Sequence, residues 1–206
     1  MKYNFAIMGA GSIAQRMGET VQKTDIVNGY AVASRDLSRA QNLADKYGFC
    51  KAYGSYDEML ADPAVDLVYI ATPHVFHASQ IEQCLRAGKH VLCEKSFTIN
   101  ADQARRVTAL AQKKGLLLAE AIWPRYMPMA KTLREFAASD KIGKIHSLTA
   151  NLGYPVYHRE PAPRPQSGRR RPAGCRNLSP DLCFLDSWGR GNRDLLVCKP
   201  QRNWSR

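Results

Sequence analysis

YNFAIMGAGSIAQRMGETVQ, residues 3–22, decides the fold of this chain. A short apolar run ends at Gly9, as a buried parallel strand does, and a helical pattern follows with Met17 and Val21 on its apolar face. The turn between them reads G-x-G-x-x-A. Its first glycine permits a tight turn, its second leaves the backbone open to a pyrophosphate, and its alanine lets the helix pack on the strand. We therefore predict a dinucleotide phosphate site, with a merely structural turn as the alternative, built from Gly9, Gly11, Ser12, Ile13 and Ala14.

Strand and helix patterns keep alternating after this stretch, with short connections. Strand patterns cover residues 29–34, 66–72, 90–95 and 116–121, and helix patterns cover residues 37–48, 55–65, 77–89 and 100–115. Gly48 is a typical residue after a helix, and Ser55 and Asn100 are typical residues before one. The alternation predicts an α/β fold, a Rossmann-type doubly wound parallel sheet over residues 1–122, with ligands at the carboxyl ends of the strands.

A different pattern begins at Trp123. A helix over residues 127–143 and a strand over residues 144–154 indicate the truncated start of an α+β open-sheet substrate domain, residues 123–160. Residues 161–206 follow neither period and hold six of the eleven prolines, so we expect this tail to be disordered.

The end of the second strand carries the signal for the type of dinucleotide. An acidic residue at this place usually binds the ribose 2′-hydroxyl of NAD. Here the position is Ser34, followed by Arg35, and Arg39 lies one helical turn further on. A hydroxyl and a guanidinium suit a 2′-phosphate. Asp36 is the natural N-cap of the next helix, so the sequence predicts NADP as the cofactor, with NAD as the alternative.

Several motifs taken together resemble one family. They are the glycine loop, Ala71-Thr72-Pro73 with His74 and His77, AGKHV at residues 87–91, and Glu94-Lys95. Over residues 1–160 the chain resembles the Gfo/Idh/MocA oxidoreductases, named after glucose–fructose oxidoreductase, inositol dehydrogenase and rhizopine catabolism. The stretch EAIWPRYMP, residues 120–128, resembles the NADP-dependent branch of this family that acts on dihydrodiols and D-xylose.

The resemblance implies hydride transfer between a nicotinamide and a sugar-like or trans-diol carbon. It makes Lys95 the catalytic residue, which binds near the reacting hydroxyl and tunes its proton transfer, because an ammonium stabilises charge that develops on oxygen. The family motif reads E-K-P, and this chain has Ser96 in place of the proline. For His77 a helix start without a ligand role, and for Trp123 core packing, stay open as alternatives. The further residues expected beside cofactor or substrate are Thr72, Pro73, His74, His77, Glu94, Trp123 and Arg125.

The tail departs from the family pattern. After residue 160 the family continues with a glycine-rich turn and a helix whose Asp and Tyr complete the active site, and the printed residues lack both. Read one nucleotide later, the possible codons from Pro161 onward permit a sequence that contains G-G-A-L-L-D-V-G-I-Y-P-L. We therefore hypothesise a change of reading frame near Glu160, which leaves an oxidoreductase that is catalytically crippled as written and has lost the family homodimer. A non-catalytic NAD(P)-binding protein is the alternative.

Charge and cysteine content limit the remaining classes. The net charge is +12, but residues 151–206 hold 11 of the 30 Lys and Arg and only 4 of the 18 Asp and Glu, so much of the basic character belongs to the tail. An Arg-rich arm that binds RNA is a remote alternative. The six cysteines form no C-x-x-C pair, and no apolar run has the length of a membrane span. We expect a cytoplasmic protein with free thiols, no metal, no nucleic-acid or membrane partner, and a small-molecule substrate.

Overall fold

The computed structural model describes residues 2–147. The chain divides into two units, Met1–Trp123 and Pro124–Arg206. The predicted disorder of residues 161–206 and most of the predicted strand 144–154 lie outside the described residues. The described part of that strand, residues 144–147, has no strand structure, which differs from the prediction.

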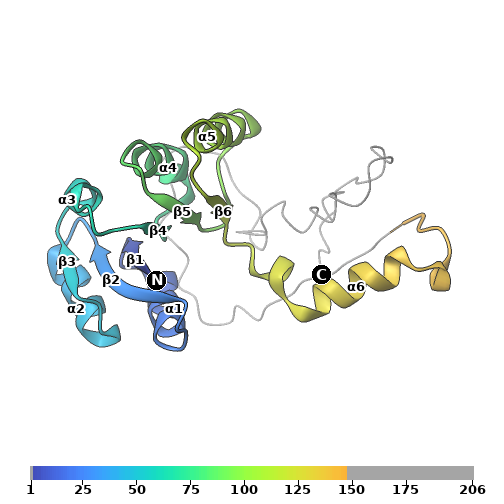
Figure 1. The fold of residues 1–206 in the computed structure, drawn as a ribbon, viewed down its shortest axis with the longest axis horizontal. Helices are drawn as coiled ribbons and strands as arrows, with labels where there is room; N and C mark the ends of the chain where they lie inside the picture. Colours follow the sequence, from blue (N-terminus) through green and yellow to red (C-terminus); the bar gives the residue numbers. More distant parts are fainter. Residues whose placement is uncertain (1, 148–206) are drawn as a thin grey trace, which may run out of the picture. The chain divides into compact units, whose positions relative to one another are not determined.

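The first unit is built on one parallel sheet. Its strands are β1 (Tyr3–Met8), β2 (Val27–Ala33), β3 (Lys51–Tyr53), β4 (Leu67–Ile70), β5 (His90–Cys93) and β6 (Leu118–Glu120). They lie in the order β3-β2-β1-β4-β5-β6, and every pair of neighbours is parallel (Figure 1). This confirms the predicted doubly wound sheet. The strand order reverses between β1 and β4, so the connections leave these two strands in opposite directions and open a crevice at their carboxyl ends.

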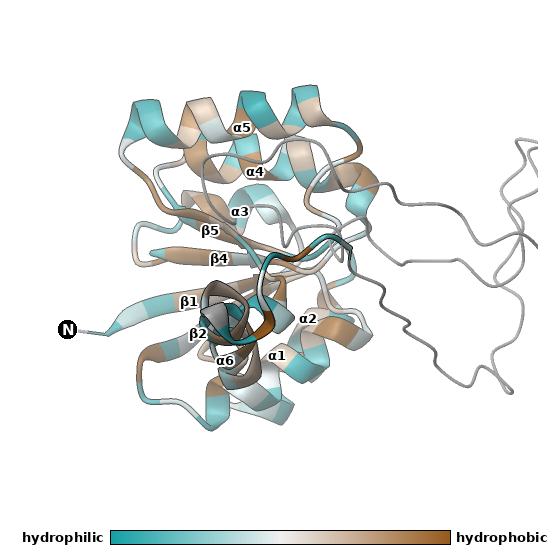
Figure 2. Ribbon diagram, turned by 90° about the vertical axis from the view of Figure 1, so that its right-hand side faces the viewer, coloured by the Kyte–Doolittle hydropathy of each residue, from teal (hydrophilic) through white to brown (hydrophobic). Residues whose placement is uncertain are grey.

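Helices cover both faces of this sheet. They are α1 (Ser12–Gln22), α2 (Leu37–Tyr47), α3 (Tyr56–Ala61), α4 (His77–Arg86) and α5 (Ala101–Lys114). α1 and α2 lie on one face, and α3, α4 and α5 lie on the other (Figure 2). Successive strand residues point to opposite faces. Phe5 and Ile7 of β1 therefore pack with α1 and α2, whereas Ala6 and Met8 pack with the other three helices.

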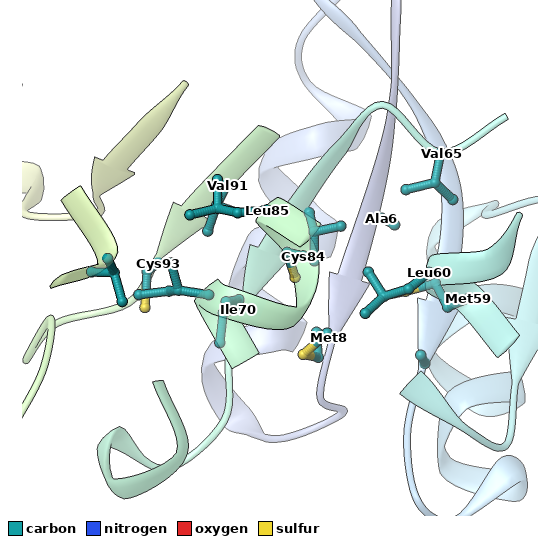
Figure 3. Close-up of a cluster of buried hydrophobic side chains, with 14 of the residues drawn as sticks. Ala6, Met8, Met59, Leu60, Val65, Ile70, Cys84, Leu85, Val91 and Cys93 are labelled. Carbon is teal, nitrogen blue, oxygen red and sulfur yellow. The ribbon is translucent and has the colours of Figure 1, made fainter. Parts of the chain in front are cut away.

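The larger buried cluster joins β1, β4 and β5 to α3, α4 and α5 (Figure 3). Ile70, Leu85 and Val91 are fully buried in it, and burying each such side chain stabilises the fold by about 1.5–3 kcal/mol. Cys84 and Cys93 lie in the same cluster as free thiols, and burial raises the pKa of both. These two cysteines behave as small apolar residues of the core.

Local signals in the sequence determine several of the helix ends. The side chain of Ser55 accepts hydrogen bonds from the N–H groups of Asp57 and Glu58, and Asn100 accepts one from Gln103. Gly48 follows α2 in the left-handed conformation, with φ of 71°. The predicted caps at Ser55, Asn100 and Gly48 are confirmed.

The sequence pattern does not predict the short elements correctly. β3 was not predicted, because three residues are too few to show a period of two, and it exists through its pairing with β2. The helix predicted over residues 127–143 is shorter. It is α6 (Pro128–Ala138), and a 3₁₀ turn, η3 (Asp140–Ile142), follows it after Ser139 takes an extended conformation.

One glycine sets the distance between α1 and α2. A Cβ atom on Gly18 would lie 2.5 Å from the ring of Tyr47, which is closer than real Cβ contacts. The two helices can pack at this distance because residue 18 has no side chain.

A carboxylate ties α3 to the sheet. Asp62 Oδ2 accepts hydrogen bonds from Tyr30 Oη at 2.9 Å, Lys51 Nζ at 2.8 Å and Tyr53 Oη at 2.6 Å. The buried Lys89 donates to the main-chain oxygen of Asp62 at 2.8 Å. The hydrogen bonds from Lys51 and Tyr53 hold the pKa of Asp62 well below its usual range, so this carboxylate is charged over the ordinary pH range.

Candidate active site

The candidate residues gather at the carboxyl edge of the sheet. Gly9 follows β1, Ser34 follows β2, Thr72 follows β4, and Glu94 follows β5. The strands are parallel, so these positions lie along one edge, and the reversal between β1 and β4 places the crevice beside Gly9 and Thr72.

The fold requires a glycine at position 9, whether or not a ligand is bound. Its φ is 105°, a conformation that side chains disfavour, and its N–H donates to the oxygen of Ala33 at 2.8 Å. A Cβ atom on Gly9 would lie 3.0 Å from the carbonyl oxygen of Ala71 and 3.2 Å from the methyl group of Thr72. The turn therefore packs tightly between the ends of β2 and β4, as the sequence predicts.

Gly11 is different, because nothing in the protein occupies the space beside it. A Cβ atom there would meet no other atom within 4 Å. Gly11 is the N-cap of α1 and provides no side-chain hydrogen bond, and the first turn has no acidic residue. The N–H groups that start α1 are therefore available to an anion, which the helix dipole also favours.

The neighbours of Gly11 complete the loop. Ser12 and Ile13 are exposed, whereas Ala14 is fully buried under the helix. An open face of main-chain N–H groups beside a glycine fits the pyrophosphate of a dinucleotide.

Two arginines stand beside this loop. Arg39 Nη2 donates to the carbonyl oxygen of Ala10 at 3.2 Å, and Arg35 is exposed at the end of β2. Arg35 and Tyr56 line the same cavity, and the positive charges of Arg35 and Arg39 oppose the rise that burial causes in the pKa of Tyr56. Positive charge therefore gathers where β2 ends.

Asp36, the acidic residue that follows Arg35, is turned toward α2. Asp36 Oδ1 accepts from Ser38 Oγ at 2.7 Å and from the N–H groups of Ser38 and Arg39 at 3.0 and 3.4 Å. The Ser38 hydroxyl and these N–H groups hold the pKa of Asp36 below its usual value. Ser34 is buried, and its Oγ accepts from the N–H of Asp36 at 3.3 Å. The role of Asp36 as an N-cap is confirmed.

A cavity of about 270 Å³ lies at this corner. Arg35 lines it from β2 and Thr72 and Pro73 line it from β4, so it opens at the same edge as the glycine loop. Tyr56, Phe76 and Gln80 were not singled out from the sequence, because a residue on a helix gives no local sign that it faces a cavity. The lining residues are Arg35, Tyr56, Thr72, Pro73, Phe76, Ser79, Gln80 and Gln83.

The segment after β4 combines exposed and buried candidates. Pro73 and His74 are exposed, and Thr72 Oγ1 donates to Gln80 Oε1. His77 is fully buried, with Nε2 2.9 Å from the carbonyl oxygen of Thr72 and Nδ1 2.8 Å from that of Ser96. Its ring thus lies behind the loops, and contact of His77 with a cofactor stays a prediction.

Glu94 and Lys95 follow β5. Glu94 Oε1 accepts from Tyr69 Oη, and Glu94 Oε2 accepts from the N–H of Lys95 at 3.1 Å. Burial and the Glu94 carboxylate raise the pKa of Tyr69, so its phenol stays a donor. The Lys95 side chain is exposed at the edge, and the peptide bond from Lys95 to Ser96 is cis.

The last two candidates lie in different units. Trp123 is 61% exposed and ends the first unit, within the 3₁₀ turn η2 (Trp123–Tyr126), and Arg125 belongs to the second. Core packing of Trp123 does not occur in the described structure, and a substrate role for Trp123 and Arg125 stays a prediction.

Within residues 2–147 no three His, Cys, Asp or Glu side chains gather as a metal site, and no helix of that part is long and apolar enough to cross a membrane.

An uncapped helix N-terminus beside Gly11, at the point where a parallel sheet reverses its strand order, is the arrangement that holds a dinucleotide. The first unit is therefore an NAD(P)-binding Rossmann domain. The sequence model of the Gfo/Idh/MocA oxidoreductase family, NAD-binding Rossmann fold, matches residues 3–121, and the chain belongs to this family.

Known proteins agree with this assignment. The chain is 44% identical over 128 residues to trans-1,2-dihydrobenzene-1,2-diol dehydrogenase from Mus musculus, and 46% identical over 123 residues to the same enzyme from Sus scrofa. These matches cover 62% and 60% of this chain but only 38% and 37% of the relatives. The chain thus matches less than two fifths of the length of these curated relatives.

Two solved structures share the fold. One is a 3-ketoreductase from Actinomadura kijaniata in complex with NADP, with a TM-score of 0.63 and 32% identity over 66% of this chain and 44% of that one. The other is GenD2 from gentamicin A biosynthesis in complex with NAD, with a TM-score of 0.63 and 30% identity over 66% of this chain and 39% of that one. A nicotinamide dinucleotide is common to both, and its type differs.

Proposed function

We propose that this chain binds NADP(H) in preference to NAD(H), as the cofactor domain of an oxidoreductase that acts on a sugar-like or trans-diol substrate. The observation that carries the choice of cofactor is the corner at the end of β2. Arg35 and Arg39 supply positive charge there, while Asp36, which could have bound a ribose hydroxyl, is used in capping α2. Arg pairs well with phosphate oxygens, so the corner suits a 2′-phosphate.

The other parts of the dinucleotide have matching places. The pyrophosphate fits the N–H groups of α1 beside Gly11, and the cavity next to Arg35 and Tyr56 suits the adenosine end. The nicotinamide, when bound, supplies the group that accepts or donates hydride. Lys95 is exposed at the end of β5, where its ammonium donates a hydrogen bond to the reacting oxygen and stabilises negative charge on it.

The relatives support a proposed substrate class. Named relatives act on trans-dihydrobenzenediol, and one structural neighbour is a 3-ketoreductase, so a vicinal diol or a sugar carbon is the proposed substrate. The boundary after residue 122, and residues 123–160 as the start of a substrate domain, belong to this proposal. So does reduced turnover of the chain as written, because residues after 160 lack the family pattern of Asp and Tyr.

A titration of both cofactors tests the proposal. The change in intrinsic tryptophan fluorescence, or the heat of binding, is measured for NADPH and NADH with the 206-residue chain. We expect NADPH to bind at least about tenfold more tightly, since a charge-assisted hydrogen bond contributes about 1.5–3 kcal/mol. Equal or tighter binding of NADH would contradict the proposed specificity.

A further inference from the structure

The turn that carries Lys95 is held by side chains from three other elements. This turn, residues 94–97, is called the lysine turn below. We propose that Tyr69, His77 and Glu120 are positioning residues that fix the main chain of the lysine turn and thereby the place of the Lys95 ammonium. The inference rests on the proposed function of Lys95.

Tyr69 holds the first residue of the turn. It is 1% exposed in the middle of the sheet, and its hydroxyl donates to Glu94 Oε1. The other oxygen of the same carboxylate accepts the N–H of Lys95 at 3.1 Å. The position of Lys95 is therefore linked through Glu94 to the rigid strand β4.

His77 holds the other side of the lysine. Its Nδ1 lies 2.8 Å from the carbonyl oxygen of Ser96, and its Nε2 lies 2.9 Å from that of Thr72. The ring is fully buried at the start of α4, so it cannot turn away into solvent. His77 thus joins the turn after β5 to the segment after β4, which lines the cavity beside Arg35.

Glu120 holds the end of the turn. Its Oε1 accepts the N–H of Phe97 at 3.0 Å, and Glu120 is the last residue of β6, which pairs with β5. The turn is therefore fixed to β4, α4 and β6, although Ser96 lacks the ring by which the proline of the family motif restricts φ.

The main chain is the only fixed reference for Lys95 in the described structure. Within residues 2–147 no hydrogen bond or ion pair involves its ammonium, and the side chain is exposed. A lysine side chain has many rotamers, so a mobile main chain would spread the ammonium over still more positions. Anchoring the turn reduces that spread before any ligand binds.

Lysine dynamics test the inference directly. The full chain is labelled with ¹⁵N-lysine, and the backbone order parameter of Lys95 is measured by NMR relaxation. We expect a value near about 0.85 in the wild type and a fall below about 0.6 in Tyr69→Phe, which removes one hydroxyl, in His77→Leu, and in Glu120→Ala.

Two internal controls separate positioning from general stability. The amides of Lys46 in α2 and Lys113 in α5 should keep their order parameters in the same variants, whereas a general loss of structure would lower all three. His77→Asn should restore order at Lys95, because its amide nitrogen matches the position of ring Nδ1 and can donate to the carbonyl oxygen of Ser96. Glu120→Gln keeps an acceptor for the N–H of Phe97 and should also stay ordered.

Each result decides the matter. An ordered Lys95 in folded Tyr69→Phe and Glu120→Ala would overturn the inference, and so would a failure of His77→Asn to differ from His77→Leu. If His77→Leu does not fold, Tyr69→Phe and the Glu120 pair decide alone. Absence of NADPH binding to the wild type would sink the proposed function, yet the order parameters would still confirm or refute the anchoring.

Discussion

The guanidinium of Arg39 donates a hydrogen bond of 3.2 Å to the carbonyl oxygen of Ala10, inside the glycine loop. A residue at the start of α2 is thereby attached to the loop before α1, and the attachment holds positive charge beside the proposed pyrophosphate site. Arg35, which follows β2, is less constrained and faces the adjoining cavity. The two arginines therefore have different roles, and their substitutions should have different effects on cofactor binding.

Arg35→Ala should weaken NADPH binding about 10- to 100-fold and change NADH binding less than about threefold, because it removes a charge-assisted partner of the 2′-phosphate alone. Arg39→Ala should weaken both cofactors, since it also releases the loop at Ala10. Arg105→Ala is the matched control, because Arg105 is exposed on α5 and pairs with Asp102. Calorimetric titration checks all three, and equal losses for the two cofactors in Arg35→Ala would contradict the assignment.

Substitution of Gly11 should affect cofactor binding, whereas substitution of Gly9 should affect stability. Gly11→Val should keep the melting temperature within about 3 °C, since its side chain meets no protein atom, and should lower NADPH affinity at least about tenfold by filling the space for the pyrophosphate. Gly9→Val should lower the melting temperature by several degrees or prevent folding, because its φ is 105° and its Cβ meets Ala71. Calorimetry and NADPH titration measure both. An unchanged melting temperature in Gly9→Val, or unchanged NADPH affinity in Gly11→Val, would contradict this prediction.

Asp62 should give the fold an acid-sensitive contribution. Its pKa is lowered in the folded state by Lys51 and Tyr53, so the contribution is complete above the ordinary aspartate pKa of about 4 and is lost as the pH falls toward the folded value. Asp62→Asn should cost about 1–3 kcal/mol at pH 7, and the difference from wild type should shrink below about pH 4. Urea unfolding across this range measures it. Asp102→Asn, at an exposed pair, is the control and should have no such effect.

The frame hypothesis predicts a difference in turnover. The chain as written and a version with the shifted frame restored after residue 160 are assayed for NADP-linked oxidation of D-xylose and of trans-1,2-dihydrobenzene-1,2-diol. The restored version should be faster by about 100-fold or more, because positioned acid–base groups contribute about 100- to 10,000-fold. Comparable turnover by both versions would refute the hypothesis.

Lys95→Ala in the more active version should reduce turnover by a similar factor and leave NADPH affinity within a few-fold, since the ammonium acts on the substrate oxygen. Lys114→Ala, at the end of α5, is the matched lysine control. Turnover that survives Lys95→Ala would show that the role taken from the family is wrong at this residue.

The sequence predicted the parts of this molecule that depend on near neighbours. The G-x-G-x-x-A turn, the cap at Asp36 and the alternation of strands and helices are written within a few residues of each other. The anchors of the lysine turn are not. Tyr69 is 25 residues from Glu94, His77 is 19 from Ser96, and Phe97 is 23 from Glu120. Those contacts exist because adjacent strands end together, and only the sheet order brings them into register.

The contrast between the glycines has a consequence for how the sequences of such genes change during evolution. Gly9 and Gly18 are enforced by the fold, since side chains there would strike Ala71 or Tyr47, whereas the space beside Gly11 is empty of protein. In lineages that keep the domain folded but no longer use a dinucleotide, position 11 should accumulate side chains while positions 9 and 18 stay glycine. Comparing substitutions at these three codons among close homologues would therefore show when cofactor use was lost. It would do so separately from the loss of structure, and it applies to genes with or without the change in reading frame.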